Sequence, residues 1–159
     1  MKTRFASVLG AALLALAAAA PARAETLRIE SRFAEANGVR LHYLVAGKGA
    51  PVILMHGYAQ TSHMWRPLIA ALAKTHTVIA PDLRGFGSSS KPPQGYDKKT
   101  MAQDVHALAA VLGHRRVKIV GHDIGLMVAY AYAAQYRNEV DRIALLDAFL
   151  PGVGDWSKV

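Results

Sequence analysis

The stretch VKIVGHDIGL, residues 117–126, decides the fold. Its first half, Val117–Val120, is typical of a short strand buried inside a parallel sheet. Its second half passes through Gly121-His122-Asp123-Ile124-Gly125 into an apolar segment with helical spacing. Glycines on both sides of Asp123 allow a sharp turn without Cβ clashes, as in a nucleophile elbow of the form G-x-Nu-x-G. The stretch therefore predicts a strand, a tight turn that holds Asp123, and a helix.

Strand and helix patterns alternate on both sides of this stretch. Near the N-terminus, Asn37-Gly38 is typical of a two-residue hairpin turn, because both residues tolerate positive φ. Strands are expected at 27–36, 39–45, 52–55, 77–80, 117–120 and 142–146, and helices at 64–72, 101–112 and 126–136. A hairpin followed by strand–helix units predicts an α/β fold, with a mostly parallel sheet, helices on both faces and an N-terminal hairpin.

The composition bounds the class of protein. The chain has 159 residues, which allows one domain. It has no Cys, which excludes disulfides, thiolate metal ligands and a cysteine nucleophile. The net charge of +8 is scattered, and a nucleic-acid partner would need a clustered basic footprint. The seven His show no metal-ligand spacing, so neither a metal nor another cofactor is expected.

The N-terminal segment has the pattern of a secretory signal peptide. Basic residues near Met1 precede an uncharged run, and Ala22-x-Ala24 matches an A-x-A cleavage site. A membrane anchor is the alternative, but the apolar core over 8–20 is shorter than the roughly 20 residues that a spanning helix needs. We therefore predict a cleaved signal at 1–24, a domain at 25–159 without a membrane span, and export to the periplasm or the medium.

An aspartate at the elbow supports a different reaction from the serine that esterases and lipases carry there. An aspartate is ordinarily ionised at neutral pH, and a helix N-terminus favours its charge. Such a carboxylate suits in-line displacement at an alkyl carbon, which gives a covalent alkyl ester that water must then hydrolyse. The leaving group is then a halide or the oxygen of a strained ring. The alternative role for Asp123 is that of a helix N-cap, a common use of Asp.

A second motif, Met55-His56-Gly57-Tyr58-Ala59, follows the apolar run that ends at Met55. Its glycine lets the backbone approach an oxyanion. The backbone amides of Tyr58 and Ile124 are candidates for a two-donor oxyanion hole. A histidine in such a loop more often packs than acts on substrate, so we do not assign His56 to proton transfer.

Three motifs together resemble the α/β-hydrolase superfamily, and they occur in the family's order. They are His56-Gly57-Tyr58, the run APDLRGFGSSSKP at 80–92, and the elbow at 121–125. More narrowly, they resemble the epoxide hydrolase branch and its exported bacterial members, over about residues 33–155. The resemblance implies hydrolysis of a small apolar epoxide to a diol through a covalent alkyl-enzyme ester. This chain departs from the family's frequent H-G-x-P motif, because Ala59 stands where the proline is expected.

Related enzymes with an Asp nucleophile differ in the turn after that residue. Haloalkane dehalogenases usually place a Trp where this chain has Ile124, and fluoroacetate dehalogenases carry arginines in this turn. Leu126 and Met127 leave the turn uncharged, which favours a leaving alkoxide that an acid from a cap domain protonates. A haloalkane-type dehalogenase remains the alternative enzyme, and a non-catalytic fragment or binding module is a third hypothesis.

The resemblance also bears on the remaining members of the site. Asp147 matches the family's pattern after the sixth strand, which makes it a candidate for the acid that orients the catalytic histidine, although a turn-capping role fits equally well. In this fold the histidine follows both acids in the chain, whereas the last histidine here is His122. We therefore expect a C-terminally truncated hydrolase core that lacks the general base and the cap and is inactive alone. Asp82 and Arg84 are expected to be structural, and the oligomeric state stays open.

Overall fold

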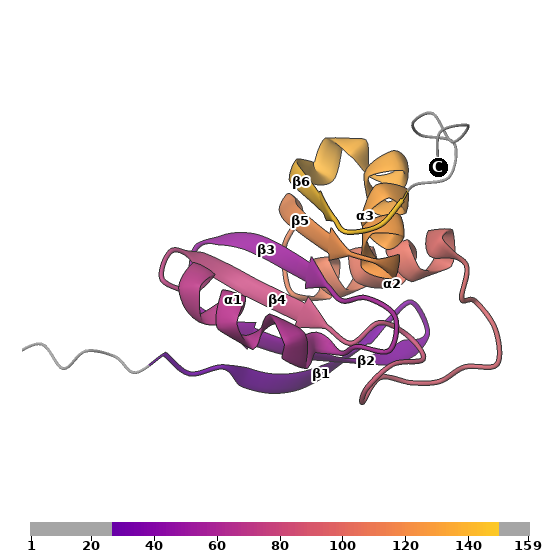
Figure 1. Cartoon of the computed structure of the whole chain (residues 1–159), viewed down its shortest axis with the longest axis horizontal. Helices are drawn as coiled ribbons and strands as arrows, with labels where there is room; N and C mark the ends of the chain where they lie inside the picture. Colours follow the sequence, from indigo (N-terminus) through magenta and orange to yellow (C-terminus); the bar gives the residue numbers. More distant parts are fainter. Residues whose placement is uncertain (1–26, 150–159) are drawn as a thin grey trace, which may run out of the picture.

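The structure is a computed structural model that describes residues 27–149 (Figure 1). The predicted signal at 1–24 lies outside the described residues. Within the described part, no helix is long and apolar enough to cross a membrane.

A six-stranded sheet forms the centre of the described part (Figure 1). Its strands are β1 (Glu30–Ala36), β2 (Val39–Ala46), β3 (Ala50–Met55), β4 (His76–Pro81), β5 (Val117–His122) and β6 (Val140–Leu146). Their order across the sheet is β1-β2-β4-β3-β5-β6. The β1–β2 and β2–β4 pairs are antiparallel, and β4, β3, β5 and β6 run parallel to one another. The predicted mostly parallel sheet is therefore confirmed.

The predicted hairpin turn between β1 and β2 is also confirmed. Asn37 has φ 51° and Gly38 has φ 75°, the positive values that a tight two-residue connection requires. The Asn37 side chain then donates a 2.7 Å hydrogen bond to Oδ1 of Asp104. This bond ties the hairpin to the helix that carries Asp104.

Helices cover both faces of the sheet, as predicted (Figure 1). They are α1 (Arg66–Leu72), which follows the 3-10 turn η1 (Ser62–Trp65), and α2 (Lys98–Val111) and α3 (Ile124–Gln135), which is followed by the 3-10 turn η2 (Arg137–Glu139). The α1 helix and η1 pack on one face, and α2 and α3 pack on the other.

Two apolar layers result, because neighbouring residues of a strand point to opposite faces. On β2, Tyr43 joins the layer under α2 and α3, and Leu44 joins the layer under α1. On β3, Ile53 and Leu54 divide in the same way, and both are fully buried. Burying such side chains contributes about 2 kcal/mol each. The central strands are thereby fixed, and the loops that follow them have a rigid base.

The strand β6 differs from the central strands because it is exposed. Among residues 27–149 it pairs only with β5, and its residues from Asp141 to Leu146 are all exposed. Ile143 and Leu146 are exposed by 40% and 41%. Within residues 27–149, β6 is therefore an apolar sheet edge, and such edges promote aggregation.

Candidate active site

The sequence motifs meet at one edge of the sheet, where the parallel strands β3, β4 and β5 end. Parallel strands direct their carboxyl ends to the same edge, which is where open α/β sheets bind ligands. The loop after β3 begins at His56, and the turn after β5 holds Asp123. The site is therefore built from two loops that lie far apart in the sequence.

The turn between β5 and α3 has the conformation of a nucleophile elbow. Asp123 adopts φ 51° and ψ −121°, a region that costs an L-residue about 1–3 kcal/mol. The Asp123 N–H donates to the Leu146 carbonyl at 3.1 Å, and the Asp123 carbonyl accepts from Leu126 N–H at 2.9 Å. The strained backbone is thus held by β6 on one side and by α3 on the other.

The two glycines of the elbow are needed for close packing. A Cβ at Gly121 would collide with the backbone of Gly125, and a Cβ at Gly125 would lie 2.5 Å from the Met55 carbonyl oxygen. Both contacts are with backbone atoms, which cannot move aside as a flexible side chain can. The G-x-Nu-x-G pattern therefore brings the start of α3 against the end of β3.

The carboxylate of Asp123 points across to the loop after β3. Its Oδ2 accepts a 2.8 Å hydrogen bond from the backbone N–H of Tyr58. Its side chain makes no capping hydrogen bond to α3, and Oδ1 has no hydrogen-bond partner among the described residues. The structure thus differs from the N-cap alternative, because the carboxylate accepts from the Tyr58 amide and makes no capping hydrogen bond to α3.

Gly57 provides the space for this carboxylate. A Cβ at this position would lie 2.8 Å from Asp123 Cβ and 2.9 Å from its Oδ2. The Gly57 N–H donates to Oε1 of Gln60 at 2.9 Å, and Gln60 N–H donates back to the Gly57 carbonyl at 3.3 Å. This clasp, which no sequence signal indicated, fixes the turn that presents the Tyr58 amide.

Ala59 has a backbone conformation that the proline of the resembled family could not adopt. Its φ is 55°, whereas the proline ring holds φ near −65°. A proline could not occupy this position in the observed conformation. The Tyr58 amide nevertheless reaches Asp123. The second predicted oxyanion donor, Ile124, begins α3, and its amide makes no described hydrogen bond to the Asp123 carboxylate.

His56 is buried and has a structural role, in line with its omission from proton transfer. Its Nδ1–H donates to the Gly57 carbonyl at 2.8 Å, and its Nε2 accepts from Leu83 N–H at 3.0 Å. Burial lowers the pKa of His56, although the bond to Gly57 opposes this effect. The imidazole is therefore held neutral, and it ties the loop after β3 to the loop after β4.

Asp147 lies beside the elbow, because it follows β6 directly. Its backbone has φ 54°, and its side chain is 89% exposed. Its Oδ2 lies 3.5 Å from Nε2 of His122, whose buried Nδ1 has no hydrogen-bond partner among the described residues. The structure places Asp147 next to the residue before the nucleophile, but gives it no described contact with the Asp123 carboxylate. Its role as the orienting acid stays a prediction.

Asp82 and Arg84 make hydrogen bonds and an ion pair within the described part of the chain, as expected. Arg84 forms a buried two-bond ion pair with Asp104, with both N–O distances at 2.5 Å. Asp82 accepts hydrogen bonds from the Ser62 and Ser88 amides at 2.7 and 2.9 Å. These pairs tie the loop after β4 to its neighbours and leave no free carboxylate for substrate.

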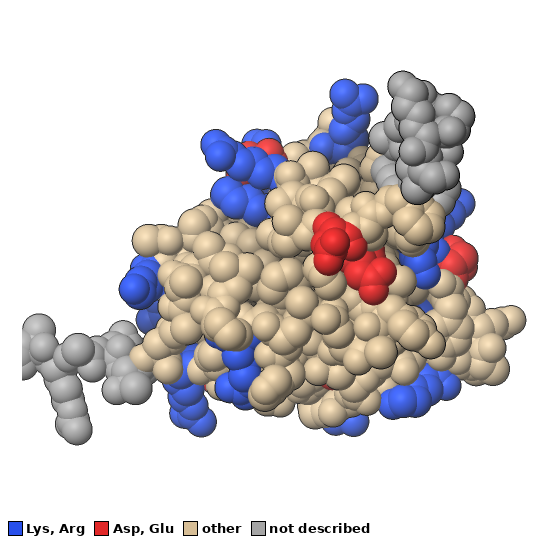
Figure 2. Space-filling model, viewed as in Figure 1, with Lys and Arg blue, Asp and Glu red and all other residues tan. Residues whose placement is uncertain are grey.

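The charges on the surface are dispersed. Figure 2 shows Lys and Arg separated by uncharged surface around the face viewed, as the sequence predicted. The described residues contain no group of His, Asp or Glu that could hold a metal ion.

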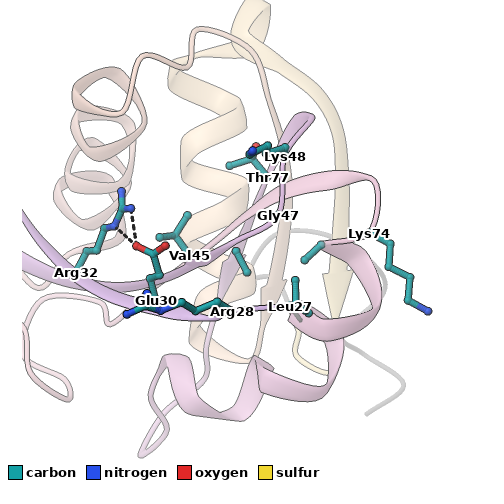
Figure 3. A pocket seen from close by; sticks show the side chains of 11 residues that line it. Leu27, Arg28, Glu30, Arg32, Val45, Gly47, Lys48, Lys74 and Thr77 are labelled. Atoms are coloured by element: carbon teal, nitrogen blue, oxygen red, sulfur yellow. Dashed lines mark hydrogen bonds and ion pairs between the residues drawn. The ribbon is translucent and has the colours of Figure 1, made fainter. Parts of the chain in front are cut away.

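A hollow of about 650 Å³ lies at the opposite end of the sheet, where β2 ends and β4 begins (Figure 3). Its lining includes Lys48 and Lys74 and the paired Glu30 and Arg32. Within this lining Arg32 donates to the Glu30 carboxylate (Figure 3). None of the predicted site residues lines it.

Comparisons with known proteins bear on the site. A family model described as alpha/beta hydrolase fold matches residues 50–158. The chain is 50% identical to a soluble epoxide hydrolase of Corynebacterium sp. (strain C12) over 117 residues, which cover 74% of this chain and 41% of that protein. It is 36% identical to a fluoroacetate dehalogenase of Burkholderia sp over 123 residues, which cover 74% and 40%.

Solved structures show the same likeness. The ligand-free epoxide hydrolase CorEH superposes with a TM-score of 0.76 at 46% identity, over 81% of this chain and 45% of that one. Cfl2 from Burkholderia cenocepacia superposes with a TM-score of 0.76 at 38% identity, over 80% and 44%. The chain spans about two fifths of the length of these curated relatives, with 41% and 40% covered.

Proposed function

The chain belongs to the alpha/beta hydrolase fold family, and from this premise we propose that Asp123 is a nucleophile that opens small apolar epoxides. The observation that carries the proposal is the hydrogen-bonding of its carboxylate. One oxygen is held by the Tyr58 amide at 2.8 Å, and the other has no described partner. A carboxylate held in this way is oriented but still has an electron pair to donate.

The first step is alkylation of the enzyme. Oδ1 of Asp123 attacks a ring carbon of the epoxide, the bond from that carbon to the ring oxygen breaks, and the oxygen leaves as an alkoxide that takes a proton from water. The product is an alkyl ester of Asp123 with a free hydroxyl group on the neighbouring carbon. The hydrogen bond from the Tyr58 amide supports this step, because it orients the carboxylate through Oδ2 and leaves Oδ1 able to attack.

The second step is hydrolysis of that ester. Water adds to the ester carbonyl, and the developing oxyanion is the former Oδ2, which already faces the Tyr58 amide. The Ile124 amide is our second proposed donor to this oxyanion. Collapse of the tetrahedral intermediate releases the diol and restores the carboxylate.

Ester hydrolysis also needs a general base, which is a histidine in the resembled family. No described histidine makes a hydrogen bond to the Asp123 carboxylate, and the sequence has no histidine after His122. We therefore propose that residues 27–149 perform the alkylation and stop at the ester. Asp147 is our candidate for orienting the base in a protein that contains one.

The second candidate function is dehalogenation, which the fluoroacetate dehalogenase relative at 36% identity favours. The same carboxylate would displace a halide from carbon. Ile124, however, packs its side chain against the apolar layer under α2 and α3, and it offers no N–H from a side chain to a departing halide. The epoxide proposal therefore ranks first.

The two candidates are separated by offering both substrates to the purified chain. One sample receives a small apolar epoxide such as styrene oxide, and the other receives fluoroacetate, with the intact mass and the released fluoride followed over time. We expect a single adduct of the mass of the epoxide, with less than one equivalent of diol and no fluoride. Fluoride release without an epoxide adduct would instead establish the dehalogenase.

We also propose that the protein is exported, on the basis of the sequence pattern at 1–24. The test is N-terminal sequencing of protein recovered from the periplasm and the medium of an expressing bacterium. We expect the mature chain to begin at Glu25, as the Ala22-x-Ala24 pattern predicts. A chain that retains Met1 in the cytoplasm would contradict the proposal.

A further inference from the structure

A second chain of hydrogen bonds links a serine, a histidine and an aspartate on the face of the sheet that α1 covers. Oγ of Ser31 lies 2.8 Å from Nε2 of His42. Nδ1 of His42 lies 2.8 Å from Oδ2 of Asp82. Ser31 and His42 come from the paired strands β1 and β2, and Asp82 follows β4. The order of groups is the one by which a histidine activates a serine hydroxyl.

The protonation states within this relay follow from the partners of Asp82. Burial disfavours the charged form of this carboxylate, but the amides of Ser88 and Ser62 and the ring of His42 outweigh burial and lower the pKa of Asp82. An ionised Asp82 can only accept, so Nδ1 of His42 carries the proton and donates it. In the neutral imidazole Nε2 is then an acceptor, and the Ser31 hydroxyl donates to it.

The hydroxyl at the end of the relay is open to solvent. Ser31 is exposed, whereas the His42 and Asp82 side chains are only 12% and 3% exposed. The base is therefore shielded and fixed, and the nucleophile is accessible. A hydrogen bond that only stabilises the fold does not require an exposed serine hydroxyl on a shielded histidine.

An aromatic group lies beside the relay. The Phe33 ring centroid is 5.2 Å from that of His42, and the Arg40 guanidinium carbon lies 3.8 Å from the Phe33 ring centroid. Phe33 is 43% exposed, and the part of its ring that Arg40 leaves uncovered offers an apolar contact for an aryl group that approaches Ser31.

The relay is separate from the elbow. β1 and β5 are separated by three strands in the sheet, which places them about 19 Å apart at the usual strand spacing. Chemistry at Ser31 can therefore be measured independently of Asp123.

We propose that Ser31 is a base-activated nucleophile that accepts an acyl group from small aryl esters. Oγ of Ser31 attacks the ester carbonyl carbon while its proton passes to Nε2 of His42. The bond from that carbon to the aryl oxygen breaks, and the aryl oxide takes the proton from His42 and leaves as a phenol. The products are an acylated Ser31 and one phenol. The described contacts provide no oxyanion donors at this position, so the proposal is one acylation per chain and not turnover.

The test treats the folded chain with p-nitrophenyl acetate and locates acetyl groups by peptide mass spectrometry. Trypsin cuts after Arg28 and Arg32, and the peptide between them contains Ser31 as its only hydroxyl residue. Ser88 is the internal control, because it is also exposed but its hydroxyl has no described partner. We expect Ser31 to acetylate about 100-fold faster than Ser88, the usual contribution of a general base.

Two comparisons show whether the relay causes the reactivity. Unfolding the chain in urea should abolish the preference for Ser31, and His42→Gln should lower Ser31 acetylation at least about tenfold. If His42→Gln does not fold, as circular dichroism will show, the comparison of folded and unfolded wild type still decides. Equal acetylation of Ser31 and Ser88 in the folded chain, or a preference that survives unfolding, would overturn the proposal.

Discussion

Asp82 and Asp123 both follow a parallel strand at the same edge of the sheet, yet their carboxylates are in opposite situations. Asp82 is buried, and its two oxygens accept bonds from the Ser62 amide, the Ser88 amide and His42. Asp123 is half-buried, and one amide, that of Tyr58, donates to it. The first carboxylate holds a loop together, and the second keeps an oxygen free for a bond to carbon.

The difference shows that the residue type alone does not decide the role. A carboxylate whose acceptor sites are filled is stabilised in its charged form and reacts poorly, because attack would break those bonds. A carboxylate with a single positioning donor keeps its reactivity. The backbone reflects the same contrast, since Asp123 has positive φ at a strained turn and Asp82 does not.

The largest expected effect on alkylation comes from replacing the Asp123 carboxylate, which has one oxygen without a described partner. Asp123→Asn should reduce alkylation by a small apolar epoxide at least about 1,000-fold, because a neutral amide is a far weaker nucleophile. The measurement is the rate of adduct formation by intact mass. The matched control is Asp97→Asn, since Asn caps a helix as well as the native Asp97 does. Equal loss in both variants would show that the effect is not specific to the elbow.

A methyl group placed against the Asp123 side chain should have the next largest effect on alkylation. Gly57→Ala places a methyl group 2.8–2.9 Å from the Asp123 side chain. We expect alkylation to fall about 10–100-fold, because a shift of about 1 Å at the reacting atom is costly. Gly38→Ala is the control, since a Cβ there meets nothing within 4 Å. This control should cost about 1 kcal/mol of stability through its positive φ, and alkylation per folded chain should not change.

Replacing the Asp82 carboxylate, which accepts several hydrogen bonds, should lower the stability of the folded chain. Asp82→Asn replaces one acceptor oxygen with an NH₂ group that faces donors, so buried groups lose their partners. We expect the free energy of unfolding to fall by about 3 kcal/mol, measured by urea denaturation at neutral pH. A change below about 0.5 kcal/mol would mean that the hydrogen bonds to Asp82 are not what holds this loop.

Lowering the pH should also remove the stabilisation that the ionised Asp82 provides, because acid protonates its carboxylate. Because the folded chain lowers the pKa of Asp82, its stabilisation is present above the ordinary carboxyl pKa of about 4 and is lost as the pH falls below that value. Wild type should therefore lose more stability between pH 5 and pH 3 than Asp82→Asn, by roughly 1 kcal/mol. Parallel unfolding curves for the two proteins over this range would contradict the assignment.

The smallest expected effect concerns His56. Burial is the main cause of its lowered pKa. The unfolded chain therefore binds a proton at His56 more readily than the folded chain does. Stability should begin to fall once the pH drops below about 6.5, the ordinary histidine value. In His56→Gln this first part of the acid transition should be weaker, as read from melting temperatures at pH 7 and pH 5.5.

The fold was predictable because its signals are local. Asn37-Gly38 specifies a turn through its backbone preferences, and the apolar run at 52–55 specifies a buried strand. The elbow was also predictable, since Gly121 and Gly125 allow the close backbone contacts that a sharp strand-to-helix turn requires. Element boundaries differ from the predicted ones by a few residues, because strand ends pair beyond the apolar runs.

The contacts between distant segments were not predictable in the same way. The Ser31–His42–Asp82 relay joins β1, β2 and the loop after β4 through side-chain geometry that has no spacing signature. The positive φ of Ala59 lies within the turn that the Gly57–Gln60 hydrogen bonds close, and alanine has no preference for that conformation. The sequence identified the Tyr58 amide as a donor, but only the structure shows that it holds Oδ2 and leaves Oδ1 free.

Mapping the epoxide adduct to a single side chain tests the central claim most directly. The wild-type chain is incubated with styrene oxide, digested, and fragmented in the mass spectrometer to locate the added mass. The account predicts one ester on Asp123 and none on Asp82, although both carboxylates lie at the same edge of the sheet. An adduct found on other residues, with Asp123 unmodified, would contradict it.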